Sequence, residues 1–301
     1  MFTDQDLELF KQRKVSVEQI ENQLESFKKG FPFLKLVSAA TINNGIIRVS
    51  ESERDRYVKV WDEYLLGTGN ILKFVPASGA ASRMFKNLFS FVEGESEEPA
   101  DSFMKNFFDN IHKFAFYADL DTVVEKKYGK CIDSMIADGK YKAVVSALLD
   151  KDGMNYGYLP KALLEFHKVE GDIHTALAEQ LEEGAQYACN KDGRVRVHFT
   201  VSGEHKTLFE KEMGRVIPEM STKYGVEYEV SMSEQKASTD TIAVNKDNTP
   251  FRENGKLLFR PGGHGALIEN LNDIQSDIVF IKNIDNVVPK TLRETTILYK
   301  K

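Results

Sequence analysis

The amino-acid sequence predicts an α/β protein built on a doubly wound, Rossmann-like mixed sheet. Three observations predict this class: short apolar runs bounded by turn-forming residues, helical spacing of apolar residues between those runs, and a regular alternation of strand and helix after Arg194. The same patterns divide the chain into an N-terminal helical extension over residues 1–68 and an α/β domain over residues 69–301. A helical insertion is expected within that domain, over about residues 87–158.

The N-terminal extension is predicted to be mostly helical. Apolar residues at helical spacing predict one helix over about residues 15–24 and another over residues 50–66. Ser50 and Glu53 have the spacing of a capping box, in which two side chains satisfy free backbone amides at the start of a helix.

The first strand of the α/β domain is expected over residues 70–76, a short apolar run between turn formers, as in a buried parallel strand. After it, residues 87–158 have helical spacing and are rich in phenylalanine, which predicts the helical insertion. One further helix is predicted over residues 173–188.

From Arg194 onward the predicted elements alternate. The strands are expected over residues 195–201, 226–232, 257–260 and 278–281, and the helices between them over residues 207–223 and 266–271. Strands that are joined through helices pair in parallel, so this order predicts a parallel arrangement at the centre of the sheet.

Charge and composition exclude several classes of protein. The 301 residues include 40 Lys and Arg and 46 Asp and Glu, a net charge of −6, which argues against a surface that coats nucleic acid. The two cysteines, Cys131 and Cys189, offer neither a disulfide framework nor a metal-binding spacing. The sequence shows no secretory leader and no long apolar run, so we expect a soluble, cytoplasmic protein without membrane or nucleic-acid partners.

A loop of small residues follows the first predicted strand. Small side chains let the backbone approach a ligand closely, and free amides at the start of the next helix attract phosphate. The nucleotide-binding candidates in this loop are Ser78, Gly79, Ala80, Ala81 and Ser82. Arg83 follows them and supplies a planar guanidinium group suited to phosphate oxygens. The alternative is a turn whose small residues serve packing, with Arg83 in solvent.

Two further positions are candidates for binding phosphate or metal. Lys161 follows a proline, and a lysine with a restricted backbone is suited to neutralise the charge of a phosphate during its transfer. Asp285 follows the last predicted strand, at the edge where open α/β sheets bind ligands, and its carboxylate suits Mg²⁺. The alternatives are an exposed lysine at a turn and a capping aspartate.

Residues 260–267 form a glycine-rich segment between a predicted strand and a predicted helix. Three glycines in four positions indicate a close approach of the backbone to another group. His264 lies among them and is either a ligand contact or a structural hydrogen-bonding residue.

The order of these motifs resembles that of the nucleotidyltransferases of GT-A-like fold, particularly the UDP-sugar pyrophosphorylases. Residues 76–84 and Pro160-Lys161 are similar to the two halves of their signature, Leu-x-Gly-Gly-x-Gly-Thr-Arg-Met and Pro-Lys. Residues 261–267 resemble the loop that contacts base and sugar, and residues 283–286 resemble the metal-binding motif. Overall the chain is most similar to an uncharacterised bacterial family recorded only as a domain of unknown function.

The resemblance implies a reaction in which a sugar-1-phosphate oxygen attacks the α-phosphorus of a nucleoside triphosphate, in this family UTP, and pyrophosphate leaves. It implies catalytic roles for Arg83 and Lys161 and a Mg²⁺ ion bound by Asp285. The residues that it places at the nucleotide, besides the small-residue loop, are Gln235, Gly263 and His264.

Two alternatives use the same fold. The first is a protein that binds a nucleotide or nucleotide sugar without catalysis, because members of the family continue well past the metal-binding aspartate and here 16 residues follow it (301 − 285). A GT-A glycosyltransferase is the second, although such enzymes usually carry Asp-x-Asp where this chain has Asn283-Ile-Asp285.

Overall fold

The computed structural model describes residues 2–79, 81–169 and 171–301. The chain forms a mixed α/β structure that divides into two compact units, unit 1 (residues 1–62 and 234–275) and unit 2 (residues 63–233 and 276–301). This division differs from the predicted boundary at residue 68, because residues 234–275 group with the N-terminal helices rather than with the sheet.

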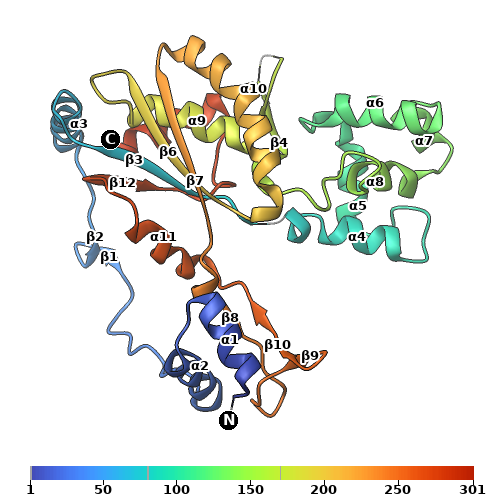
Figure 1. The fold of residues 1–301 in the computed structure, drawn as a ribbon. Helices are drawn as coiled ribbons and strands as arrows, with labels where there is room; N and C mark the ends of the chain where they lie inside the picture. The colour runs from blue at the N-terminus through green and yellow to red at the C-terminus, as the bar shows by residue number, and fades with distance from the viewer. Residues whose placement is uncertain (1, 80, 170) are drawn as a thin grey trace. The chain divides into compact units, whose positions relative to one another are not determined.

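A four-stranded sheet forms the centre of unit 2 (Figure 1). Its strands are β3 (Ile71–Pro76), β6 (Arg194–Val201), β7 (Glu227–Glu234) and β12 (Ile278–Ile281), in the order β12-β3-β6-β7. β12 and β6 both pair with β3 in parallel. The strands predicted over residues 70–76, 195–201, 226–232 and 278–281 are therefore confirmed.

Side-chain pairs fix the alignment of β6 with β7. Arg196 Nε donates to Glu229 at 2.9 Å, and His198 Nδ1 lies 2.8 Å from Ser231 Oγ. Both pairs join residues 33 positions apart, so the two strands advance together, as parallel strands do.

Helices α9 (Ala176–Tyr187) and α10 (Lys206–Tyr224) connect these strands and pack on one face of the sheet (Figure 1). Gly184 allows α9 to come close, since a Cβ atom here would lie 3.0 Å from Cγ1 of Val195. The α/β class and the parallel pairing are thus present within unit 2. A doubly wound arrangement needs helices on both faces and remains a prediction.

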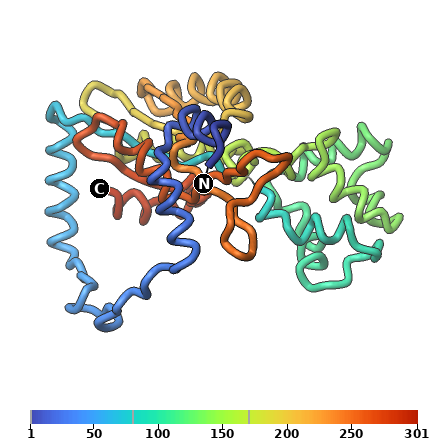
Figure 2. Tube along the Cα trace, turned by 60° about the horizontal axis from the view of Figure 1, so that its bottom comes forward, coloured from blue at the N-terminus to red at the C-terminus, as the bar shows by residue number. Residues whose placement is uncertain are grey.

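The segment predicted as a helical insertion is helical in the structure. It contains five α-helices: α4 (Lys86–Glu93), α5 (Ser102–Asp109), α6 (Tyr117–Tyr128), α7 (Ile132–Ala137) and α8 (Tyr141–Leu149). Phenylalanines 107, 108 and 116 are buried in its core, which accounts for the phenylalanine-rich sequence. Figures 1 and 2 both show these green helices gathered beside the sheet rather than upon its faces.

The start of the helix predicted over residues 173–188 is wrong. Residues Asp172–Thr175 form strand β5, which pairs in an antiparallel hairpin with β4 (Glu165–Val169). α9 begins only at Ala176, where the Thr175 side chain accepts a hydrogen bond from Ala178 N and caps the helix.

Unit 1 has its own small core. Phe10 of α1 (Asp4–Arg13) and Ile20 of α2 (Val17–Lys29) are buried with Ile242, Leu257 and Phe259. The other elements of unit 1 are β1 (Thr41–Ile42), β2 (Gly45–Ile46), α3 (Glu51–Leu65, which runs on past residue 62 into unit 2), β8 (Thr241–Ile242), β9 (Arg252–Glu253), β10 (Lys256–Leu257), β11 (Phe259–Arg260) and α11 (Ile268–Asn272).

The prediction of a single strand of the main sheet over residues 257–260 is wrong. These residues form parts of β10 and β11, and β11 pairs with β8 in a two-stranded ladder instead of joining the main sheet. The capping box at the start of α3 is confirmed, since Glu53 Oε2 accepts from Ser50 N at 3.0 Å and Ser50 Oγ accepts from Glu53 N.

Candidate functional site

The carboxyl ends of β3 and β12 are the candidate ligand-binding edge of the sheet. The chain passes from β3 to β6 on one side and places β12 on the other side of β3, so the strand order reverses between β3 and β12. Open α/β sheets bind ligands at such a switch point, beyond the carboxyl ends of the strands.

The small-residue loop lies at this edge and is held by backbone hydrogen bonds. Ala77 N donates to Thr200 O at 2.9 Å, and Gly79 O accepts from Lys161 N at 3.3 Å. Ala81 N donates to Leu159 O at 3.3 Å, so this amide is already used by the protein rather than free for phosphate. The segment around Lys161 is thereby fixed against the loop.

The helix after the loop is also less favourable for phosphate than predicted. The 3₁₀ turn Ala81–Arg83 follows directly, and α4 begins only at Lys86 without a side-chain cap. The helix dipole therefore favours phosphate at residues 78–82 less than predicted, because the dipole acts within the first turn of a helix. Ala80 lies outside the described residues.

Lys161 and Asp285 meet at the same edge. The Lys161 ammonium group donates to Asp285 Oδ2, and both side chains are partly buried. Ile284 N donates to Pro76 O at 3.1 Å, and the Gln180 amide donates to Asn283 O at 2.8 Å, so the turn that carries Asp285 is anchored on β3 and on α9.

Arg83 is exposed at the end of the 3₁₀ turn. Over the part of the chain that the structure describes, its guanidinium group forms no ion pair with an acidic side chain. Ser78 and Gly79 are half-buried in the loop, and Ser82 is exposed beside Arg83. Arg83 is thus a cation available to an anionic ligand.

The glycine-rich segment lies in unit 1. Gln235 Nε2 donates to Gly262 O at 3.3 Å, so this glutamine is brought to the loop that contains Gly263 and His264. Gly262 is needed for this approach, since a Cβ atom there would lie 2.9 Å from Thr239 O. Gly263 and His264 are exposed. These residues belong to unit 1, and Arg83, Lys161 and Asp285 belong to unit 2.

The structure adds a histidine at the sheet edge that the sequence analysis missed. His205 Nε2 donates to Tyr158 O at 3.2 Å, and His205 Nδ1 lies 2.7 Å from Ser202 Oγ. Ser202 directly follows β6, so both residues lie at the carboxyl end of a parallel strand. The available signal was the turn sequence Ser-Gly-Glu-His after a predicted strand.

A network of buried charges links α9 to the sheet. Glu183 is fully buried and accepts from Lys282 Nζ at 2.7 and 2.8 Å, with Lys73 Nζ at 3.4 Å. Lys73 also donates to Gln180 O at 2.6 Å. Burial lowers the pKa of Lys73 to about 7. Lys73 lies within a predicted buried strand, and this position is the sequence signal for an acidic partner nearby.

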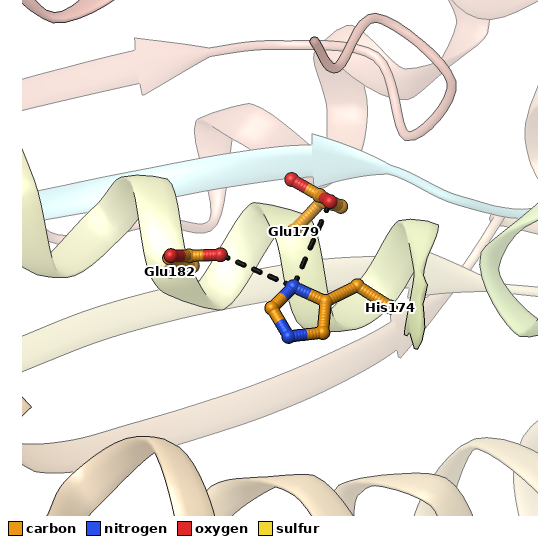
Figure 3. Close-up of side chains that lie close together, drawn as sticks. All are labelled: His174, Glu179 and Glu182. Atoms are coloured by element: carbon orange, nitrogen blue, oxygen red, sulfur yellow. Dashed lines mark ion pairs between the residues drawn. The ribbon is translucent and has the colours of Figure 1, made fainter. Parts of the chain in front are cut away.

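His174, Glu179 and Glu182 form a second part of this network (Figure 3). His174 Nδ1 lies 3.2 Å from Glu182 and 3.6 Å from Glu179, and hydrogen bonding to these two carboxylates raises the pKa of His174 to about 9. Their ligand atoms lie close enough together for a metal ion. However, the buried guanidinium group of Arg293 pairs with both glutamates and already supplies positive charge there. We therefore assign this cluster a structural role.

Comparison with known proteins gives one family. The profile described as "Domain of unknown function (DUF4301)" matches residues 3–301. No curated protein and no solved structure matches the chain. None of the helices in the described residues has both the length and the apolar character needed to cross a bilayer.

Proposed function

Because the chain belongs to the DUF4301 family, whose description assigns no activity, we propose from its own residues that it is a Mg²⁺-dependent nucleotidyltransferase. The reaction would join a nucleoside triphosphate to a sugar-1-phosphate. An oxygen of the sugar phosphate forms a bond to the α-phosphorus, the bond from that phosphorus to the bridging oxygen breaks, and pyrophosphate leaves. The GT-A-like fold and UTP as the nucleotide come from the resemblance described above and belong to this proposal.

One observation carries the proposal: a lysine and an aspartate from distant parts of the chain meet at the switch point of a parallel sheet, against a small-residue loop. Phosphoryl-type transfers depend chiefly on positioning and on charge stabilisation, for which a fixed lysine and a free arginine are suited. Arg83 would pair with the leaving pyrophosphate, and Lys161 with the α-phosphate.

Asp285 fits a Mg²⁺ ion that arrives with the nucleotide. Mg²⁺ in nucleotide sites is bound by one or two carboxylates, with phosphate oxygens and water as the other ligands, and Asp285 supplies one carboxylate. Its oxygen is held by the Lys161 ammonium group in the free protein. We expect nucleotide binding to transfer Lys161 from this carboxylate to a phosphate, and the bound metal would neutralise phosphate charge.

The test is pyrophosphate exchange with labelled pyrophosphate, Mg²⁺ and a panel of nucleoside triphosphates and sugar-1-phosphates. Loss of one charge-stabilising group costs about 100- to 1,000-fold in comparable sites, so Lys161→Ala and Arg83→Ala should each reduce exchange by about this factor. Lys168→Ala, an exposed lysine on β4, is the matched control and should leave exchange unchanged.

Two outcomes contradict the proposal. If both Arg83→Ala and Lys161→Ala turn over at the wild-type rate, these residues are not the catalytic groups. If UTP binds but no sugar-1-phosphate supports exchange, the protein is a nucleotide-binding protein without transferase activity. Circular dichroism of each variant separates loss of chemistry from loss of fold.

A further inference from the structure

An aromatic cavity of about 310 Å³ is lined by residues of the helical insertion, by Met84 and Phe85 before it, and by residues 164–166 after it. Seven of its twelve lining residues are aromatic. Their rings support one another: Phe114 stacks on Phe116 with centroids 5.0 Å apart, and Tyr156 meets Phe116 edge-on at 5.6 Å. All the lining residues belong to unit 2, so the cavity is defined within one compact unit.

Among the residues that the structure describes, Glu165 is the one carboxyl group in this aromatic lining. Its Oε2 atom is shielded from solvent, and no hydrogen-bond donor within the described residues reaches it. Its backbone amide donates to Tyr156 Oη at 3.2 Å, which fixes this residue against the cavity wall. A buried acceptor atom without a donor is costly, so Oε2 of Glu165 calls for a ligand that satisfies it.

The charges around Glu165 are mostly negative. Asp119 of α6 faces it, and from α10 it faces Glu212 and Arg215. Arg215 donates to both carboxylate oxygens of Glu212, at 2.9 and 2.7 Å, so its positive charge is already paired. Burial, a hydrogen bond with the carboxyl group of Asp119 and the negative charge of Asp119 raise the pKa of Glu165 to about 8. The cavity therefore has a surplus of negative charge when Glu165 is ionised.

We propose that this cavity binds an organic cation with an alkylated ammonium group, such as the trimethylammonium group of choline. Such a group carries its positive charge on methyl groups, which contact the faces of aromatic rings and need no hydrogen-bond acceptors. A metal ion would need several oxygen ligands, which the phenylalanine-rich wall does not supply. A neutral apolar ligand would leave Oε2 of Glu165 without a partner.

The cavity adjoins the two candidate catalytic cations in the sequence. Met84 in its wall directly follows Arg83, and Leu164 directly follows the 3₁₀ turn Lys161–Leu163. This cation site is nevertheless independent of the proposed transferase activity, because its test uses binding of the cation alone.

The test is isothermal titration calorimetry of the full chain with choline and with its neutral isostere 3,3-dimethylbutan-1-ol. The cation binds the ionised form of Glu165, so choline affinity should rise about 10-fold or more between pH 6.5 and pH 8.5. Near pH 7 binding should release close to one proton, seen as a dependence of the heat on the buffer. The neutral isostere should bind more weakly and show no dependence on pH.

The Glu165→Gln variant keeps the shape of the cavity and removes its charge. We expect choline affinity to fall at least about 10-fold at pH 8.5, with loss of both the pH dependence and the proton release, while the neutral isostere is unaffected. Glu125→Gln, an exposed glutamate of α6, is the matched control. Equal binding of choline and its isostere, unchanged choline binding by Glu165→Gln, or no binding of choline at millimolar concentration would each overturn the proposal.

Discussion

The buried lysine of β3 makes the stability of the protein depend on pH in an unusual direction. Lys73 is fully buried, and two lysine side chains, Lys73 and Lys282, share the single carboxylate of Glu183. Burial is the main cause that lowers the pKa of Lys73 from 10.5 to about 7. Lys73→Met keeps a long side chain of similar shape and removes the titrating group.

The magnitude follows from proton counting. Between pH 7 and pH 10.5 the folded state holds Lys73 neutral, whereas the unfolded chain binds a proton there, so unfolding takes up a proton. Raising the pH then disfavours unfolding by about 1.4 kcal/mol for each pH unit. From pH 7.5 to pH 9.5 Lys73 therefore contributes a rise of about 3 kcal/mol, which the methionine variant lacks.

The assay is urea unfolding followed by circular dichroism at pH 7.5, 8.5 and 9.5 for the wild-type protein and Lys73→Met. Other groups titrate in both proteins, so the difference between the two slopes isolates Lys73. Lys168→Met, an exposed lysine, is the control and should follow the wild-type slope. Parallel curves for the wild type and Lys73→Met would refute the reasoning, since Lys73 would then keep its proton in the folded state.

Three further changes test the helix that carries the buried glutamates. Glu183→Gln should lower the free energy of unfolding by about 3–5 kcal/mol in urea denaturation, because buried Lys282 loses its carboxylate partner. The pKa of His174 is raised to about 9 in the folded protein, so its protonated ring stabilises the fold fully below pH 6.5 and this contribution is lost as the pH rises through 9. His174→Gln should remove this decline when the free energy of unfolding is measured over a pH series. Gly184→Ala should cost about 1–3 kcal/mol through overpacking. Gly214→Ala on α10 is the control. A Cβ atom there would have no neighbour within 4 Å, so thermal melting should show no loss of stability.

The sheet strands could be predicted from local sequence: β3 and β12 are short apolar runs, and apolar and polar residues alternate along β6 and β7. The strand at residues 278–281 is found at the same residues in the structure. The β4–β5 hairpin could not be predicted in this way, since it depends on pairing across a turn in which Gly171 has a φ of 96°. The pattern of residues 173–188 alone is equally compatible with a longer helix.

Lys161 and Asp285 were each predicted as single candidates, but their ion pair was not. The two residues are 124 positions apart, and they meet because β12 pairs with β3 and because Lys161 N donates to Gly79 O in the loop after β3. The buried glutamates of α9 were missed for a similar reason. An amphipathic pattern places acidic residues in solvent, and the partners Lys282 and Arg293 lie about a hundred residues further along the chain.

The pairing of β12 with β3 also has a consequence for synthesis of the protein on the ribosome. Ile71 pairs with Ile278, which is made 207 positions later (278 − 71). At ordinary rates of translation this interval lasts about 10–40 s, during which one edge of β3 has no partner strand and Glu183 lacks Lys282. A nascent chain stalled before residue 278 would therefore present an unpaired strand edge and leave Glu183 without its Lys282 partner at the same time, which makes this intermediate prone to aggregation.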